Sequence, residues 1–306
     1  MFTYKGRAAV VTGGSSGIGL GIAEALADKG MNIVIVGRNA AKAEVAAERI
    51  RAKGVNALAV PMDVADREAT FALAKRVEEE LGGVEVLVLN AGVTTAGQLV
   101  DHIPEDWDWV FDTLIGGPAN GLQAFLPGLI EQGHGHIVIT ASMVGLVPDY
   151  FLHHGPYAAA KSGIIGLVTA LRPELEGTGV GVSALIPAGV DTALMDSHSG
   201  RPGVQLGALP AEKAPHPMGS IMPRDDAPDL LRASEFISPE YVGRRVIDGI
   251  DKNHHFIITH PEFRPAFEEY SKRILEAFDY GMDHEKGLGR TAVESPGSNE
   301  ETKAPM

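Results

Sequence analysis

The chain has 306 residues and no cysteine, which excludes disulfide bonds and any metal site built from thiolates. The lack of cysteine also fits a reducing compartment such as the cytoplasm. No apolar run approaches the roughly 18 residues that a membrane-spanning helix requires. A secretory signal is not expected, because Lys5 and Arg7 precede only a short apolar run that leads into a glycine turn. We therefore expect a cytoplasmic protein that does not use a membrane.

Positive charge is also scarce, with 26 lysine and arginine residues against 40 aspartate and glutamate residues and a formal net charge of −14. Such a chain is not expected to bind nucleic acid or an anionic membrane surface. An anionic cofactor would therefore need a locally positive site. The composition is otherwise that of a globular protein, with 44% hydrophobic residues, and alternating strand and helix patterns favour one large domain.

A local site of this kind follows a short apolar strand at residues 7–12. The sequence TGGSSGIG at residues 12–19 turns directly into a helix whose apolar residues recur on one face. Glycines allow a tight turn, and backbone N–H groups at the start of a helix attract the pyrophosphate of a dinucleotide. The spacing differs from the strict dinucleotide-binding fingerprint, and the alternative is a glycine-rich turn without a ligand. The predicted cofactor-binding residues of this loop are Gly13, Ser15, Ser16, Gly17, Ile18 and Gly19.

The second predicted strand, residues 32–36, ends near Arg38, where folds specific for NAD usually place an acidic residue. The planar donors of a guanidinium suit a 2′-phosphate, so Arg38 favours NADP(H) over NAD(H), unless it is merely a surface arginine. Farther on, Asp63 and Val64 follow another strand and are also predicted to bind the cofactor. The Asp63 carboxylate is expected either to accept a hydrogen bond from an adenine amino group or to cap the helix that starts near Asp66.

Two later strands also end in residues suited to a ligand crevice. The apolar strand at residues 84–89 is followed by small or amide-bearing residues that leave room for a cofactor beside the backbone. They are Asn90, Ala91 and Gly92. The strand at residues 136–140 is followed by Ser142, which we expect to point into the same crevice.

Tyr157 and Lys161 stand four residues apart in a predicted helix, which brings their Cβ atoms to roughly 5–6 Å on one face. The ammonium of Lys161 is expected to lower the pKa of the Tyr157 hydroxyl from its ordinary value near 10. Tyr157 would then serve as proton donor and acceptor for a carbonyl. Because this spacing occurs in many helices, the pair is informative only together with its neighbours.

Taken together, TGGSSGIG, NAG at residues 90–92, Ser142 and YAAAK at residues 157–161 resemble the short-chain dehydrogenase/reductase family over roughly residues 5–195. The resemblance implies an α/β fold, in which residues 1–286 form a single Rossmann-type doubly wound domain with a mostly parallel seven-stranded sheet. It also implies hydride exchange between NADP(H) and a small-molecule ketone or secondary alcohol.

By the same resemblance, Ser142 binds the substrate oxygen, Tyr157 transfers the proton, and Lys161 assists Tyr157 and binds the nicotinamide ribose. In the loop after the sixth strand, the Val190 backbone and the Thr192 side chain are expected to hold the carboxamide. The cofactor-binding residues implied in this part of the chain are Tyr157, Lys161, Pro187, Val190 and Thr192.

One departure from the family lies in a long helix predicted for residues 107–130, with a kink or irregular turn expected at residues 116–118. Members of the family usually carry an asparagine where this chain has Leu114, and that asparagine is associated with a water that links the lysine to solvent. A leucine side chain cannot hold such a water, and Asn120 lies nearly two turns away. We therefore expect a reduced but real activity.

Two adjacent histidines, His153 and His154, lie in a lengthened connection at residues 148–156 that is expected to line the substrate side. They are candidates for substrate contact or for the proton relay, although adjacent histidines in a loop are more often surface residues. No acidic or histidine partner stands near them at metal-ligand spacing, so we expect no metal site.

The rest of the chain changes character after Thr192. Residues 196–237 are rich in proline, glycine and charge, and we expect a lid over a bulky hydrophobic or aromatic substrate, the alternative being a flexible surface loop. Ser238 then starts a helix. A last strand and a helix at residues 262–280 precede a tail, residues 287–306, that is expected to be disordered or to wrap a partner subunit.

Residues 117–121 and 259–262 resemble, more loosely, a longer subgroup that includes bacterial Cα-type dehydrogenases of aryl-substituted secondary alcohols. This favours an aromatic ketone or benzylic alcohol as substrate. The family resemblance also implies a homodimer or homotetramer packed through the helices at residues 104–131 and 156–176. The alternative function is an NADPH-binding protein of low catalytic activity that acts in assembly or regulation. Another reaction on the same fold, such as dehydration or epimerisation, also stays open.

Overall fold

The computed structural model describes residues 2–202 and 236–287 of the chain. It divides into two compact units, the first ending at Phe263 and the second beginning at Arg264. The single domain over residues 1–286 therefore stays a prediction. Most of the predicted lid at residues 196–237, and the tail from residue 288 onward, lie outside the described residues.

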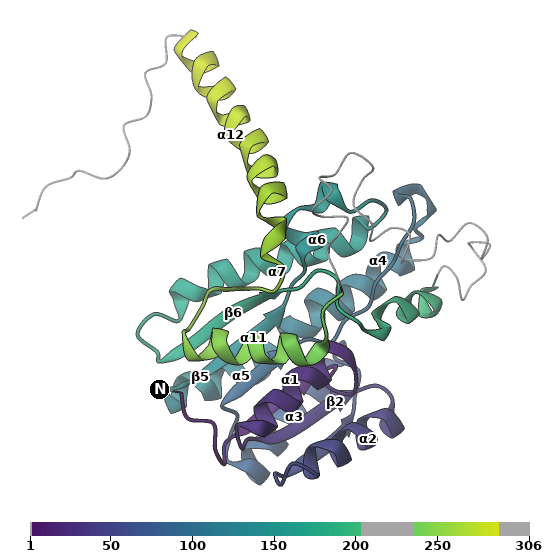
Figure 1. Cartoon of the computed structure of the whole chain (residues 1–306), viewed down its shortest axis with the longest axis vertical. Helices are drawn as coiled ribbons and strands as arrows, with labels where there is room; N and C mark the ends of the chain where they lie inside the picture. Colours follow the sequence, from purple (N-terminus) through teal and green to yellow (C-terminus); the bar gives the residue numbers. More distant parts are fainter. Residues whose placement is uncertain (1, 203–235, 288–306) are drawn as a thin grey trace, which may run out of the picture. The chain divides into compact units, whose positions relative to one another are not determined.

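The first unit is built on a parallel sheet that, in the described part, has seven strands in the order β3-β2-β1-β4-β5-β6-β7. The inner strands are short apolar runs that are buried along their whole length, as expected where helices cover both faces of a sheet (Figure 1). This confirms the predicted doubly wound fold. The strands are β1 (Ala8–Thr12), β2 (Asn32–Gly37), β3 (Ala57–Pro61), β4 (Val86–Leu89), β5 (Gly135–Thr140), β6 (Val180–Ile186) and β7 (Phe256–Ile258).

Several of the helices flanking the sheet begin at a polar residue whose side chain accepts a backbone N–H, namely Asn39, Asp66, Ser142 and Ser238. Ser238 accepts a hydrogen bond from the Tyr241 N–H, so it caps its helix as predicted. The helices α1 and α11 lie side by side on one face (Figure 1). The helices are α1 (Gly17–Asp28), α2 (Ala40–Arg51), α3 (Arg67–Leu81), α4 (Pro104–Phe111), α5 (Gly117–Gln132), α6 (Met143–Leu146), α7 (Gly155–Glu174) and α11 (Pro239–Asp251).

The helix predicted as continuous over residues 107–130 is interrupted between α4 and α5. A π-helical turn, Asp112–Gly116, joins the two, so the irregularity lies slightly before the predicted residues 116–118. Pro118 has no N–H to donate to the carbonyl four residues earlier, which is the carbonyl of Leu114, and this weakens the regular α-helical pattern there.

The second unit contains the helix α12 (Arg264–Gly287), which begins and ends later than the predicted residues 262–280. The last turns lack apolar periodicity but contain no proline before residue 287, so nothing in their sequence stops the helix. Among the residues that the structure describes, no helix combines the length and apolar character needed to cross a membrane.

Candidate functional site

A cavity of about 390 Å³ opens at the carboxyl ends of the strands, beside β1 and β4. The chain runs from β1 outward to β2 and β3, and then returns to place β4 on the other side of β1. Such a reversal leaves a crevice where open α/β sheets bind ligands. All the predicted cofactor-binding and catalytic residues line this cavity, with the exception of Gly19. The cavity is also lined by residues that were not predicted, among them Lys42, Thr113, Leu194 and Ser197.

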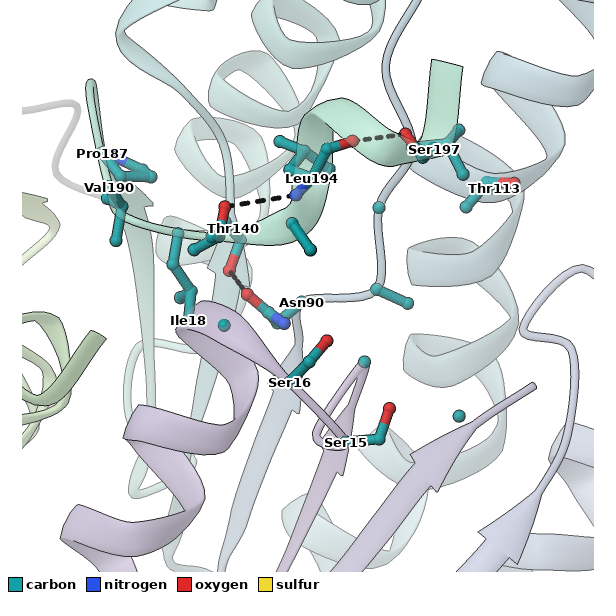
Figure 2. A pocket seen from close by; sticks show the side chains of 18 of the residues that line it. Ser15, Ser16, Ile18, Asn90, Thr113, Thr140, Pro187, Val190, Leu194 and Ser197 are labelled. Carbon is teal, nitrogen blue, oxygen red and sulfur yellow. Dashed lines mark hydrogen bonds between the residues drawn. The ribbon is translucent and has the colours of Figure 1, made fainter. Parts of the chain in front are cut away.

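The glycine-rich loop meets the loop after β6 across the cavity. Gly17 has φ +51°, and a Cβ atom there would approach Thr192 Cγ2 to 2.9 Å, so a larger residue would be both strained and crowded. Gly19 serves a different purpose, because a Cβ atom there would overlap the Gly13 carbonyl. Gly19 therefore lets the loop pack onto α1 instead of forming the cavity wall. Figure 2 shows Ser15 and Ser16 of this loop beside the cavity.

A hydrogen-bond network forms the base of the cavity. Thr140 Oγ1 donates to Asn90 Oδ1 at 3.1 Å (Figure 2). Asn90 Nδ2 donates to the Thr12 carbonyl at 3.2 Å. The Thr12 hydroxyl in turn accepts the backbone N–H groups of Asn90 and Ala91 at 2.8 and 3.1 Å. The ends of β1, β4 and β5 are thereby fixed relative to one another, which preorganises the wall against which a ligand would lie.

Ser142, Tyr157 and Lys161 are brought together at this end of the sheet, and all three are buried. Ser142 caps the short helix α6, while Tyr157 and Lys161 lie one turn apart in α7, as predicted. Lys161 Nζ donates to the Thr140 carbonyl at 2.6 Å and lies 5.7 Å from the centre of the Tyr157 ring. The network at the cavity base therefore also holds the lysine.

The electrostatics of the pair differ from the sequence-based expectation that Lys161 lowers the pKa of Tyr157. Burial raises the pKa of Tyr157 to about 12, against which a hydrogen bond with Ser142 acts to lower it. Burial also lowers the pKa of Lys161 to about 7, so a large fraction of the amine is neutral at neutral pH. A partly neutral amine lowers the pKa of a neighbouring phenol less than a fixed ammonium would.

Two cations stand at the rim where β2 ends. Arg38 follows β2 and Lys42 lies one turn into α2, and both side chains are exposed and line the cavity. Within the described residues, neither side chain makes an ion pair or hydrogen bond. Asn39 holds the start of α2 by accepting the Lys42 N–H at 2.9 Å. Sequence reasoning missed Lys42, and the only signal for it is a second positive charge shortly after Arg38, in the first turn of the helix that follows β2.

Asp63 and Val64, in the loop that follows β3, line the cavity. Asp63 Oδ1 accepts the Ala65 N–H at 3.0 Å, whereas Asp66 caps α3 by accepting the Ala69 N–H. The alternative that Asp63 caps this helix was therefore wrong. Asn120 Nδ2 donates to the Val64 carbonyl at 3.0 Å, so Asn120 supports this loop and is not positioned to replace the family's asparagine.

The opposite wall comes from the 3-10 helix η4 (Ala193–Gly200), which overlaps the start of the predicted lid at residues 196–237 and for which the sequence predicted no helix. Ser197 Oγ accepts the Thr94 N–H at 3.0 Å and donates to the Leu194 carbonyl at 2.6 Å (Figure 2). Arg201, just after η4, is fully buried and pairs with the buried Asp106 at 2.8 Å. These contacts attach η4 to the segment that follows β4.

Leu114 and the two adjacent histidines lie outside the cavity lining. Leu114 is buried in the π-helical turn beside Gly92. His154 is buried, and its Nδ1 lies 3.0 Å from the Thr95 carbonyl, so Nδ1 carries the proton. His153 has φ +63°, and its carbonyl accepts the Gly97 N–H at 2.9 Å. Both histidines thus connect the segment before α7 to the segment after β4, and their predicted role in the reaction stays a prediction. In the described part of the chain, no three His, Asp or Glu side chains gather as they would around a metal ion.

Comparisons with known proteins place these features in a family. The chain is 30% identical over 281 residues to a Cα-dehydrogenase from Sphingobium sp. strain NBRC 103272 / SYK-6, covering 90% of this chain and 88% of that protein. It is 36% identical over 194 residues to a 3-oxoacyl-[acyl-carrier-protein] reductase, FabG, from Staphylococcus aureus, covering 63% of this chain and 78% of that protein.

A solved structure gives the same result. A short chain dehydrogenase/reductase from Burkholderia phymatum, in complex with NAD, superposes with a TM-score of 0.80 at 28% identity and covers 96% of this chain and 99% of that one. A family profile described as short chain dehydrogenase matches residues 7–201, which include the glycine-rich loop, Ser142, Tyr157 and Lys161. The chain therefore belongs to the short chain dehydrogenase family of oxidoreductases.

Proposed function

We propose that the protein is an NADP(H)-dependent oxidoreductase that interconverts a ketone and a secondary alcohol, with a bulky or aromatic substrate. The observation that carries this proposal is the burial of Ser142, Tyr157 and Lys161 together beside the glycine-rich loop. Two hydroxyl groups there can donate hydrogen bonds to a substrate oxygen where negative charge develops. The same cavity extends toward Arg38, so a dinucleotide and a carbonyl compound could share it.

In the proposed reduction, bound NADPH supplies the hydride that the carbonyl carbon accepts. Ser142 holds the substrate oxygen by donating a hydrogen bond. Tyr157 gives its hydroxyl proton to that oxygen as the C–H bond forms, so the alcohol is released neutral. Lys161, with a pKa of about 7, is suited to return a proton to Tyr157 at neutral pH. Oxidation of the alcohol reverses each step.

The preference for NADP(H) over NAD(H) rests on Arg38 and Lys42. Both are exposed at the rim, and together they provide the local positive charge that a 2′-phosphate needs in a chain of net charge −14. The Burkholderia phymatum relative was crystallised with NAD, an observation that concerns the cofactor of that protein and not of this chain. We propose that the other predicted residues lining the cavity also contact the cofactor. In this arrangement the loop at residues 187–192 contacts the nicotinamide end of the dinucleotide.

The proposed substrate class rests on the cavity wall and on one relative. Leu194 and Phe236 add apolar surface to the wall near the loop after β6. The relative named Cα-dehydrogenase aligns with 90% of this chain, which includes parts that the FabG reductase does not match. An aromatic ketone or benzylic alcohol therefore fits better than a 3-oxoacyl thioester.

Turnover of a ketone panel tests the proposal. The panel contains aryl alkyl ketones, aliphatic ketones and a 3-oxoacyl thioester, with the loss of NADPH absorbance as readout. We expect the aryl ketones to react fastest and Tyr157→Phe to lower kcat by about 100-fold or more, because a general acid is lost. Full turnover by Tyr157→Phe would overturn the mechanism.

The same experiment addresses the second candidate function, a binding protein of low catalytic activity, which the burial of Leu114 in place of the family's asparagine favours. Tight NADPH binding without turnover of any ketone would support it. We further propose a cytoplasmic homodimer or homotetramer, and light scattering on the purified protein tests the oligomeric state.

A further inference from the structure

The segment at residues 259–262, which the proposed reaction does not use, contains a buried histidine directly behind the cavity wall. His260 follows β7 within the first unit and is 1% exposed. Its Nδ1 accepts the Ala188 N–H at 3.2 Å, and its Nε2 lies 3.1 Å from the Gly189 carbonyl. Both partners belong to the loop after β6 that lines the cavity.

These two contacts require one tautomer of the ring. A carbonyl oxygen only accepts, so Nε2 carries the proton and donates to Gly189. Nδ1 is then the acceptor that the Ala188 N–H requires, and the Thr259 hydroxyl, 2.8 Å away, also faces it. One neutral imidazole therefore bridges a donor and an acceptor on consecutive residues of the loop.

Among the described residues, Met143, Ile237 and His260 hydrogen-bond to the backbone of this loop from outside it. The Met143 N–H donates to the Pro187 carbonyl at 2.8 Å from the β5 side, and the Ile237 N–H donates to the Gly189 carbonyl at 3.0 Å. His260 alone among these holds both Ala188 and Gly189. Because neither contact belongs to the pairing between β6 and β7, the sheet can form without the imidazole.

The same turn also contacts the connection between Ser142 and Tyr157. The Phe263 ring lies edge-on to His260 at 6.4 Å and stacks on Phe151 at 5.8 Å between ring centres. Phe151 belongs to the connection between Ser142 and Tyr157. The turn that contains His260 thus joins the loop after β6 to the connection that leads from Ser142 to Tyr157.

We propose that His260 is a positioning residue that holds the loop of Pro187, Ala188, Gly189 and Val190 in the shape that receives the nicotinamide end of the dinucleotide. The inference rests on the proposed function, because it assigns that end of the cavity to the nicotinamide. His260 is not among the residues that line the cavity. Its effect is carried by the two hydrogen bonds to the loop backbone.

Binding of a whole cofactor and of its adenine half separates positioning from a general structural role. The two probes are NADPH and adenosine 2′,5′-bisphosphate, which lacks the nicotinamide, and both are titrated by calorimetry. We expect His260→Phe to weaken NADPH binding by about tenfold, as the loss of buried hydrogen bonds to the loop predicts. Binding of adenosine 2′,5′-bisphosphate is expected to stay within about twofold of the parent.

Two further variants separate the two hydrogen bonds. His260→Asn places an amide oxygen near the position of Nδ1 and keeps the bond from Ala188, whereas His260→Gln places an amide N–H near Nε2 and keeps the bond to Gly189. Each is expected to lose less NADPH affinity than His260→Phe. The matched control is His255→Phe, the same substitution at the opposite end of β7, which we expect to bind both probes like the parent.

The outcomes are distinct. Equal loss of affinity for both probes in His260→Phe, or unchanged affinity for NADPH, would overturn the inference, and thermal unfolding of each variant shows that the folded protein is being titrated. If the parent binds NADH and ADP instead of the phosphorylated pair, the same comparison is made with them and only the cofactor preference fails. A parent that binds no dinucleotide would reject the proposed function and the inference with it.

Discussion

Lys161 and Tyr157 illustrate, at the scale of single residues, how burial sets the chemistry of the site. Burial disfavours the charged form of each, which lowers the pKa of Lys161 to about 7 and raises that of Tyr157 to about 12. A pKa near 7 allows the lysine to take up and release protons in neutral solution at little cost in free energy. In the proposed reaction, Lys161 would therefore act as a proton carrier and not as a permanent cation beside the phenol.

Arg38 and Lys42 give the first prediction at this scale. Arg38→Asp is expected to change the ratio of kcat/KM for NADPH to that for NADH by about 10- to 100-fold in favour of NADH, because a carboxylate repels a 2′-phosphate and accepts a bond from a 2′-hydroxyl. Lys42→Ala should shift the ratio in the same direction by less. Arg76→Asp, which changes an exposed arginine of α3 outside the cavity, is the control and should leave the ratio unchanged.

Leu114 gives the second prediction. Leu114→Asn restores the amide that the family usually carries, so we expect a few-fold rise in kcat and a change in its pH profile. The buried amide is also expected to lower the stability of the fold, because it replaces apolar packing beside Gly92.

Leu114→Ala is the matched variant, since it removes the leucine without adding an amide. Steady-state rates across pH and thermal unfolding are measured for both. Should Leu114→Asn show the rate and pH profile of the parent, the absence of asparagine would have no bearing on turnover.

Sequence reasoning at this scale brought the residues of short motifs to one cavity, whereas their roles in a reaction stay predictions. The glycine-rich loop, Ser142, Tyr157 and Lys161 could be assigned to one crevice because parallel strands place their carboxyl ends at one edge. The pKa values could not be predicted from spacing, because they depend on how deeply the fold buries each group. Lys42 was missed because its proximity to Arg38 depends on where α2 begins.

At the scale of elements, the site depends on segments that are far apart in sequence. The 3-10 helix η4 forms one wall, and the buried Arg201 after it bonds Asp106 and also the carbonyls of Ala96 and Asp101 at 2.9 and 2.8 Å. Asp106 also accepts the Ile103 N–H at the start of α4. One ion pair therefore connects the wall of the cavity to a helix start nearly 100 residues earlier.

This pair gives the third prediction. Asp106→Ala leaves the guanidinium of Arg201 buried without its counter-charge, and we expect the free energy of unfolding to fall by about 3–5 kcal/mol. The double variant Asp106→Leu with Arg201→Met should recover part of that loss, because no charge is then left unpaired. Denaturant midpoints measure both.

The exposed pair of Arg76 and Glu80, 2.8 Å apart on α3, provides the control. Arg76→Ala is expected to cost less than about 1 kcal/mol. A similar cost for Asp106→Ala would show that the buried pair contributes little to the fold.

The elements themselves were largely predictable, since strand and helix periods alternate along the first unit. The predictions were wrong or missing where tertiary contacts determine the local backbone conformation. The π-helical turn Asp112–Gly116 was placed slightly too late, because Pro118 shows only that a helix is disturbed nearby. The wall formed by η4 has no periodic pattern in sequence, and its shape depends on Arg201 and Ser197.

On the scale of the whole molecule, the sheet places the cavity at one end of its strands and a buried titratable residue near the other. The carboxyl ends of the strands hold the cavity, whereas His136, one residue into β5, is buried near the opposite end. His136 Nε2 lies 2.8 Å from the Ser183 hydroxyl, which donates to the His254 carbonyl, so Nε2 donates to Ser183. Phe2 lies edge-on to the ring. None of these groups can stabilise a second proton on the imidazole.

His136 gives the last prediction, a dependence of stability on pH that is independent of catalysis. Burial, with a smaller effect of the Arg172 charge, lowers the pKa of His136 from 6.5 to about 3 in the folded protein. Between these values the unfolded chain binds more protons than the folded one, so stability is complete above pH 6.5 and falls as the pH decreases toward 3, by up to about 1.4 kcal/mol per pH unit. Thermal unfolding from neutral to acid pH should show this slope in the parent and a flatter slope in His136→Gln, which has no proton to gain.

The exposed His254, changed to Gln as the control, should keep the slope of the parent. Because the ring is remote from the cavity, turnover by His136→Gln at neutral pH should match the parent, and an equally steep acid slope in that variant would assign the loss of stability to other groups.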